Sequence, residues 1–114
     1  MQGAVTGGRR VNFGDNSIAA YAREIAADEN AHVTFLRQQL GSAAIAQPAI
    51  NIDGGANGAF TAAARSAGVI GPNDIFDPFA NVENFLIGSY LLTDVGVTAY
   101  RGSARLITNK TFLE

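Results

Sequence analysis

The stretch IAAYAREIAADENAHVTFLRQQL, residues 18–40, carries the strongest evidence for the fold class of this chain. It contains no glycine and no proline, so nothing in its interior breaks a helix. The three residues before it, at positions 15–17, are Asp, Asn and Ser, which are all good N-caps, and Gly41 directly after it is typical of a helix end. These features predict one long helix from Ile18 to Leu40.

Within this helix, steps of three and four residues mark one face as a packing seam. Glu29 and His32 fall on this seam, whereas polar residues such as Arg23 and Glu24 mostly lie away from it. We therefore expect Glu29 and His32 to be buried on the inner face of the helix. The complete seam comprises Ile18, Ala22, Ile25, Glu29, His32, Leu36 and Gln39.

A second long helix is predicted from Pro78 to about Tyr100 or Arg101. Asp77 is a suitable N-cap, and Pro78 fits the first helical position because its missing N–H costs nothing there. Gly102 is predicted to end the helix. The seam of this helix has the same spacing and comprises Phe79, Val82, Leu86, Ser89, Thr93, Gly96 and Tyr100.

The long connection between the two helices is predicted to hold a short helix and several turns. The short helix runs from Gly58 to Ala67, with Asn57 as its cap and Phe60 as its apolar anchor. Residues 50–52 are a candidate short strand. The order of elements is therefore long helix, long crossover with a short helix, long helix.

The two ends of the chain carry weaker signals. Residues 1–14 are rich in glycine and are predicted to form a loop. Residues 103–114 are predicted to be an extended tail in which Asn109 or Thr111 could start another helix. We interpret residues 1–114 as a single domain, since 114 residues suffice for one domain and no more.

Composition excludes several classes of function. The net charge of −2 provides no basic field for nucleic acid, and we interpret Arg9–Arg10 as part of a solvated loop. The chain has no cysteine, which excludes disulfides and thiolate metal sites. No apolar run approaches the ~18 residues of a membrane-spanning helix, and the first residues contain no apolar stretch of signal-peptide length. None of these features assigns the protein to a cellular compartment.

Glu29 and His32 are the candidate metal ligands. Residues three apart on a helix point to the same side, so a carboxylate and an imidazole in this spacing can bind one metal ion together. Such an oxygen-rich set with one imidazole suits iron or manganese. The alternative is that Glu29 pairs with a neighbouring Arg, Tyr or Ser and that His32 is a core histidine with a satisfied hydrogen bond.

The second long helix offers no convincing further ligand. Thr93 occupies the inward centre of its seam and is a poor metal ligand. Asp94 is turned away by ~100°, and Glu83 lies about three turns nearer the start of the helix. The sequence therefore argues against a complete di-metal site within one chain.

Four segments carry a resemblance to a known family. Residues 25–33 (IAADENAHV), 76–81 (FDPFAN), 94–100 (DVGVTAY) and 107–114 (ITNKTFLE) resemble the ferritin-like domain proteins that include the plant desiccation-related proteins and many bacterial relatives. The resemblance covers nearly the whole chain. Relatives are often exported.

The resemblance implies an all-α, partial ferritin-like bundle. The first and fourth bundle helices would precede Met1 and follow Glu114, and the two predicted long helices would run parallel. Of the family's ligands, only Glu29 and His32 match, because Thr93 stands where relatives carry a glutamate. Two helices alone would expose apolar faces, so we expect a homo-oligomer, a dimer or higher, that completes the bundle.

Two functions follow as hypotheses. The first is a desiccation- or stress-related structural protein with an incomplete metal site and no catalysis. The second is an iron- or manganese-binding oxidoreductase whose di-metal site assembles between chains, with Glu29 and His32 from each copy. A truncated gene product is a third possibility.

Overall fold

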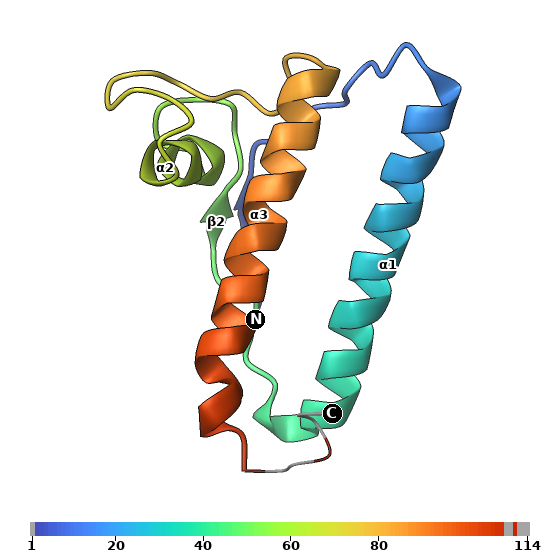
Figure 1. Ribbon diagram of the computed structural model, residues 1–114. Helices are drawn as coiled ribbons and strands as arrows, with labels where there is room; N and C mark the ends of the chain where they lie inside the picture. The colour runs from blue at the N-terminus through green and yellow to red at the C-terminus, as the bar shows by residue number, and fades with distance from the viewer. Residues whose placement is uncertain (1, 109–110, 112–114) are drawn as a thin grey trace.

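The computed structural model describes residues 2–108 and 111. The chain is mostly helical, with two long helices joined by a crossover that carries a short helix and a two-residue strand (Figure 1). The elements are β1 (Val5–Thr6), α1 (Asn16–Leu40), η1 (Gly41–Ala43, 3-10), β2 (Ile50–Asn51), α2 (Ala59–Ser66), α3 (Val82–Ser103) and η2 (Ala104–Leu106, 3-10). The predicted helical architecture with two long helices and a long crossover is confirmed.

Helix α1 follows the local signals at both of its ends. The Asp15 carboxylate accepts hydrogen bonds from the backbone N–H of Ser17 at 2.7 Å and of Ile18 at 3.4 Å. Gly41 terminates the helix with a positive φ of 51°, which glycine adopts readily. The helix begins two residues earlier than predicted, at Asn16.

Helix α3 begins four residues later than predicted. Asn81 is its N-cap and accepts from the Asn84 N–H at 2.8 Å. Asp77 instead accepts from the Phe79 N–H at 3.0 Å, which forms a turn ahead of the helix. The predicted cap at Asp77 and first residue at Pro78 are therefore wrong.

The other predicted boundaries also need correction. Helix α3 continues through Gly102 to Ser103, and residues 104–106 form a 3-10 turn rather than an extended tail. The cap position of α2 is Gly58, not Asn57, and it makes no side-chain hydrogen bond. Of the two predicted helix starts, Asn109 lies outside the described part of the chain, and Thr111 is described without its immediate neighbours.

The N-terminal segment is more ordered than a loop. Strand β1 pairs in parallel with β2, with Val5 opposite Ile50 and Thr6 opposite Asn51. The candidate strand at residues 50–52 is thus confirmed, and its partner within residues 1–14 was not foreseen. The pairing brings the N-terminal segment beside the crossover.

A small core lies between α2 and α3. It consists of Ala64 from α2, Leu91 from α3 and Phe76 from the segment that joins them, with Phe60 and Ile70 packed against it. The predicted role of Phe60 as the apolar anchor of the short helix is confirmed. This core holds the crossover against one face of α3.

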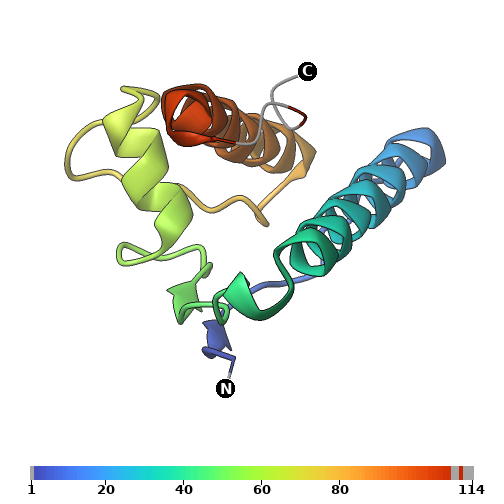
Figure 2. The same ribbon diagram turned by 90° about the horizontal axis from the view of Figure 1, so that it is seen from below.

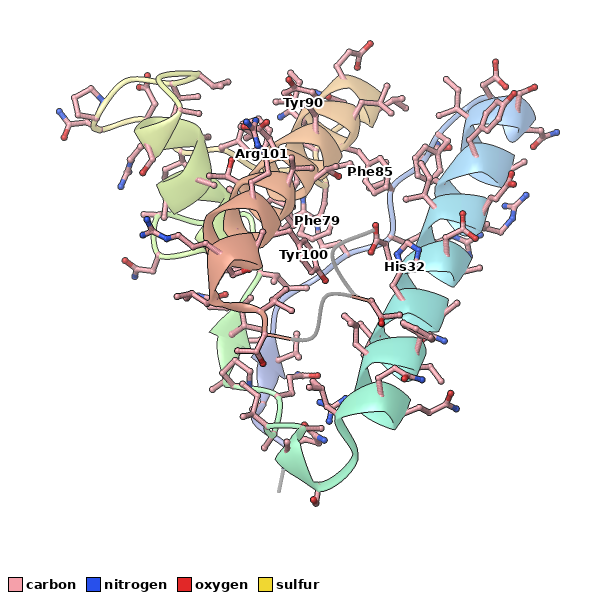
Figure 3. All side chains as sticks on the ribbon, turned by 60° about the horizontal axis from the view of Figure 1, so that its bottom comes forward. His32, Phe79, Phe85, Tyr90, Tyr100 and Arg101 are labelled. Atoms are coloured by element: carbon pink, nitrogen blue, oxygen red, sulfur yellow. The ribbon has the colours of Figure 1, made fainter. Side chains whose placement is uncertain are left out.

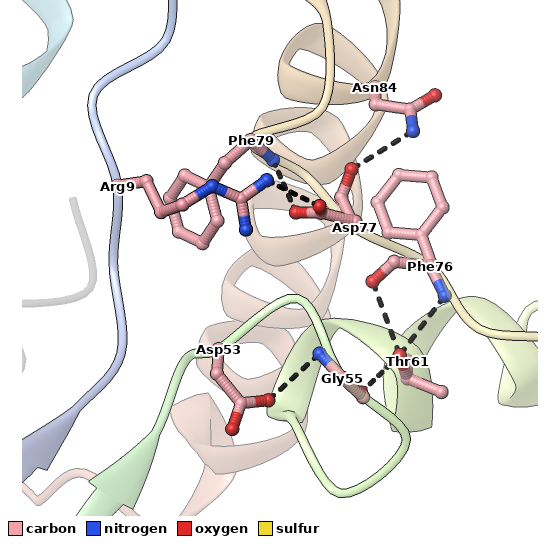
Figure 4. Close-up of polar contacts among 8 residues, drawn as sticks. All are labelled: Arg9, Asp53, Gly55, Thr61, Phe76, Asp77, Phe79 and Asn84. Atoms are coloured by element: carbon pink, nitrogen blue, oxygen red, sulfur yellow. Dashed lines mark hydrogen bonds and ion pairs between the residues drawn. The ribbon is translucent and has the colours of Figure 1, made fainter.

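A buried hydroxyl group fixes the same region. The Oγ1 atom of Thr61 lies 2.8 Å from the Gly55 carbonyl oxygen and 3.2 Å from that of Phe76, and it accepts from the Phe76 N–H at 3.1 Å (Figure 4). Thr61 is fully buried. One side chain therefore satisfies backbone groups from two loop segments that flank α2.

Arg9 makes specific contacts, whereas the sequence suggested a solvated residue. Its guanidinium pairs with the Asp77 carboxylate at 2.5 Å and lies 5.7 Å from the centre of the Phe79 ring (Figure 4). Partial burial raises the pKa of Asp77, but the hydrogen bonds from Arg9 and from the Phe79 N–H, together with the Arg9 charge, outweigh it and hold this pKa below its ordinary value. The ion pair ties the N-terminal segment to the turn before α3.

Helices α1 and α3 run in the same direction, as predicted, and their axes lie apart from each other (Figure 1). Figure 2 shows α2 against one side of α3 and α1 on the other. The radius of gyration, 16.0 Å, exceeds the roughly 13 Å expected for a compact domain of this length. The chain is therefore less compact than usual, and α1, which buries no residue, is its least packed helix.

The predicted burial of the α1 seam is wrong for the single chain. No residue of α1 is buried, and the side chains of Glu29 and His32 are 65% and 68% exposed. The physical reason is that the seam of α1 faces α3 alone. No other element in the described part of the chain covers that side of the two helices.

Candidate functional site

A groove of about 700 Å³ runs between α1 and α3 and contains both candidate ligands. The α1 wall is formed by Ile25, Glu29, His32, Val33 and Leu36, and the α3 wall by Ser89, Leu92, Thr93, Gly96, Val97 and Tyr100. Most of these residues belong to the two predicted seams. The periodicity of the sequence therefore predicted correctly which faces of the two helices face each other. It did not predict how exposed these faces are.

Glu29 and His32 lie side by side on the α1 wall because one uninterrupted helix places residues three apart on the same face. His32 Nδ1 is 3.4 Å from Glu29 Oε2, a contact at the long end of hydrogen bonding. Figure 3 shows His32 on the side of α1 that looks towards α3, with Phe85 and Tyr100 on α3. The pair is accessible from the groove and is not locked by other side chains that the structure describes.

The α3 wall presents hydroxyl groups and apolar side chains rather than carboxylates. The Thr93 hydroxyl donates to the Ser89 carbonyl oxygen at 2.9 Å, and the Ser89 hydroxyl donates to the Phe85 carbonyl oxygen at 2.9 Å. Both hydroxyls are thus engaged within their own helix. Glu83 and Asp94 do not line the groove, as the spacing predicted.

The residues present do not fit a complete di-metal centre. Such centres in ferritin-like bundles take a Glu from each of two helices and a Glu-x-x-His motif from each of two others. Over residues 2–108 and 111, no group of three or more His, Cys, Asp or Glu side chains comes together in a way that could hold a metal ion. Within one chain, Glu29 and His32 would provide one of the two Glu-x-x-His motifs of such a centre, and we refer to this pair as the half-site.

A second hollow, of about 760 Å³, lies near the start of both helices. The loop at residues 10–14 closes it on one side, and Phe13 contacts Phe85 edge to face with ring centres 5.0 Å apart. Neither Glu nor His lines this hollow, and Asp15 is already used as the cap of α1. Its charged lining residues are Arg10, Asp15 and Arg23, and it contains neither of the candidate metal ligands.

Sequence reasoning missed the residues that hold the crossover against α3. Thr61 sits in an alanine-rich helix, and nothing in its neighbours indicates that its hydroxyl joins two distant loops. Arg9 and Asp77 are 68 positions apart in the sequence, so no local pattern predicts their ion pair. Both contacts position α3, and therefore the α3 wall of the groove.

No helix in the described part of the chain is long and apolar enough to span a membrane.

Comparison with known proteins bears on the whole of this arrangement. A family model described as the ferritin-like domain matches residues 4–114. No curated protein and no solved structure matches this chain. The match to the family model covers both long helices, the crossover and the half-site.

Proposed function

Because the chain belongs to the ferritin-like domain family, we propose that it is a structural ferritin-like module of the desiccation- or stress-related type, without catalysis of its own. The observation that carries this proposal is the ligand count of the groove. Glu29 and His32 are present, but the α3 wall contributes no carboxylate. A chain that supplies one of the two Glu-x-x-His motifs and neither of the two further glutamates retains the bundle architecture and loses the redox chemistry that needs the full set.

The desiccation-related part of the proposal is supported by the resemblance of residues 76–81 and 94–100 to that group of proteins. These segments cover the turn before α3 and the centre of its groove wall. A direct test is to dry an enzyme that loses activity on desiccation together with this chain and to measure the activity recovered. We expect more recovery than with an unrelated helical protein of equal mass, and equal recovery would contradict the stress-related role.

A second candidate function is favoured by the geometry of the pair itself. Glu29 and His32 are adjacent and open to the groove, so a second pair from another chain could add to them. The product would be a metal-binding protein whose site is shared between chains. Iron or manganese suits the ligand types, since carboxylate oxygen and imidazole nitrogen both bind these ions.

Metal analysis separates the two candidates. Protein purified without chelator is measured for iron and manganese, and its melting temperature is recorded with and without added Fe²⁺ or Mn²⁺. A structural role predicts substoichiometric metal and no shift in melting temperature, because an ion that does not bind the folded state cannot stabilise it.

Variants make the measurement specific. Glu29→Ala and His32→Ala remove the half-site, and Glu24→Ala serves as a matched control on the same helix outside the groove. Stoichiometric metal that is lost in both half-site variants and kept in the control would overturn the structural proposal. It would establish the shared metal site in its place.

A further inference from the structure

The crossover carries the one Asn-Gly pair of the sequence, Asn57–Gly58, directly ahead of α2. Asparagine is a chemically labile residue. It is most labile before glycine, because a residue without a side chain does not hinder attack of its own backbone nitrogen on the asparagine side chain. Whether such a pair reacts in a folded protein depends on how firmly the fold holds it.

The fold leaves the side chain of Asn57 free to react. Asn57 is exposed in a turn, and its side chain makes no hydrogen bond to any residue that the structure describes. Its carbonyl oxygen accepts from Asn51 Nδ2 at 3.5 Å, and the Gly58 N–H donates to the Gly55 carbonyl oxygen at 3.2 Å. Both hydrogen bonds are long, so they restrain the backbone of the pair only weakly.

Packing requires that the residue after Asn57 is a glycine. Gly58 is buried, and a Cβ atom built on it would overlap the Asp53 carbonyl oxygen and stand 2.9 Å from Asp53 Oδ1. A bulkier residue at position 58 would slow the attack, but it does not fit. The close approach of two backbone segments therefore keeps the reactive pair in the sequence.

The neighbouring Asp53–Gly54 pair has similar chemistry but is held in place. Asp53 is partly buried, its Oδ1 atom accepts from the Gly55 N–H at 2.9 Å (Figure 4), and its own N–H donates to Asn51 Oδ1 at 2.9 Å. The side-chain oxygens of Asn12 and Asn81 also accept backbone hydrogen bonds. Asn57 thus combines a following glycine, exposure and a free side chain.

We propose that Asn57 is a site of spontaneous deamidation. Hydroxide removes the proton of the Gly58 backbone nitrogen, which then attacks the Asn57 Cγ atom. The bond from Cγ to the side-chain nitrogen breaks, this nitrogen takes a proton from water, and ammonia leaves a cyclic imide. Water opens the imide at either carbonyl and gives an aspartate or an isoaspartate at position 57. No oxidant or reductant is needed.

The two products act differently on α2 because of where the turn lies. Isoaspartate adds one methylene group to the main chain between Gly55 and Gly58. The Gly55 carbonyl oxygen also lies 2.8 Å from the Oγ1 atom of the buried Thr61 (Figure 4), so a longer main chain disturbs the contact that fixes α2. An aspartate keeps the ordinary backbone and places a carboxylate near the start of a helix, where negative charge is favourable.

The first test compares the rate at Asn57 in the folded and unfolded chain. The parent is incubated at mildly alkaline pH with and without guanidinium chloride, and deamidation is located from the masses of peptide fragments. We expect the folded rate to lie within about tenfold of the unfolded rate, since an exposed turn opens at little cost. Asn57→Ser should abolish the product. Stronger suppression in the folded chain, or earlier reaction at Asn51, would refute the proposal.

The second test isolates the effect of the added methylene group. The acidic fraction that forms during incubation of the folded parent is purified by ion exchange and compared with freshly prepared Asn57→Asp, which has the same charge and an ordinary backbone. We expect the acidic fraction to melt about 4 °C or more below the variant. An enzyme that methylates isoaspartyl carboxyl groups should label the acidic fraction and not the variant.

Equal melting temperatures, or an acidic fraction that is not methylated, would overturn the proposed isoaspartate and its effect on α2. These outcomes are independent of the structural role and of metal binding. The reaction lies in the crossover, and none of its residues lines the groove that contains Glu29 and His32.

Discussion

The two faces of α3 differ in how completely they are packed. The face towards α2 buries Leu91 and is closed by Phe76, and a Cβ on Gly88 would stand only 3.1 Å from the Cβ atom of Pro78. The face towards α1 lines a groove in which Val97 and Tyr100 stay more than half exposed. One face of α3 is thus packed against the rest of the chain, whereas the opposite face stays largely exposed.

This contrast indicates that the stability of the single chain resides on the α2 side. Helix α1 buries no residue, so its helical state depends on propensity, on its N-cap and on whatever covers the groove. On the α2 side, by contrast, Ala64, Phe76 and Leu91 are already buried within the single chain. The two faces should therefore respond very differently to matched substitutions.

A pair of phenylalanines should separate the two sides most clearly. Phe76→Ala removes a side chain that is 5% exposed and should lower the free energy of unfolding by about 3–5 kcal/mol, through lost burial and the cavity left behind. Phe35→Ala on α1, where the side chain is 52% exposed, should change it by less than about 1 kcal/mol. Urea denaturation measures both, and equal losses would show that α1 is as well packed as α2.

A pair of threonines should give the next effect in size. Thr61→Val leaves the buried Phe76 N–H without its acceptor and should cost about 2 kcal/mol. Thr34→Val removes only an exposed hydrogen bond to the Asn30 carbonyl oxygen and should cost about 0.5 kcal/mol or less. The same denaturation experiment applies, and a neutral Thr61→Val would contradict the role given to this hydroxyl.

The N-cap of α1 provides a more modest effect that is confined to the open side. Asp15→Ala removes the acceptor for the Ser17 and Ile18 N–H groups and should cost about 1 kcal/mol of helix stability. We expect faster amide exchange along the first turns of α1 and little change in α2. Asp28→Ala, an exposed change in the middle of the helix, is the control. Comparable exchange in both variants would argue against the cap.

The ion pair before α3 should contribute least. Because the pKa of Asp77 is lowered in the folded chain, its contribution to stability is present above the ordinary value of 3.8 and is lost as the pH falls through the lowered value. Asp77→Asn should therefore cost about 0.5 kcal/mol near neutral pH, and this difference should vanish in strong acid. Thermal unfolding across this pH range tests it, with Arg9→Gln as the partner variant. A difference that persists in acid would contradict the sign.

Local chemistry explains why much of this fold was predictable. The uninterrupted stretch at residues 18–40, the cap at Asp15 and the glycine stop at Gly41 are all properties of adjacent residues. The start of α3 was misplaced because Asp77 and Pro78 form a good local cap signal, yet they form a separate turn and Asn81 caps the helix. The contact of Arg9 with the Asp77 carboxylate spans 68 positions, so neighbouring residues do not predict it.

The candidate site was predictable only in part for the same reason. Helical spacing alone places Glu29 and His32 on one face, and the structure places that face on the groove. Their burial was overestimated, because a periodic pattern reports that a face is apolar but not whether anything covers it. The resemblance to the ferritin-like domain family was confirmed by the family match, whereas metal binding, oligomeric state and the stress-related role stay predictions.

Neighbouring residues were sufficient to set the two long helices, their facing seams and the position of the acid–imidazole pair, since propensity, capping and periodicity act over a few positions. The contacts of Thr61 and Arg9, the packing of α3 on one face, and the open groove beside α1 came from the folded chain alone. Those features depend on which segments pack against each other. The free energy of burial arises only when two segments remove each other's apolar surface from water, so neither segment determines it alone.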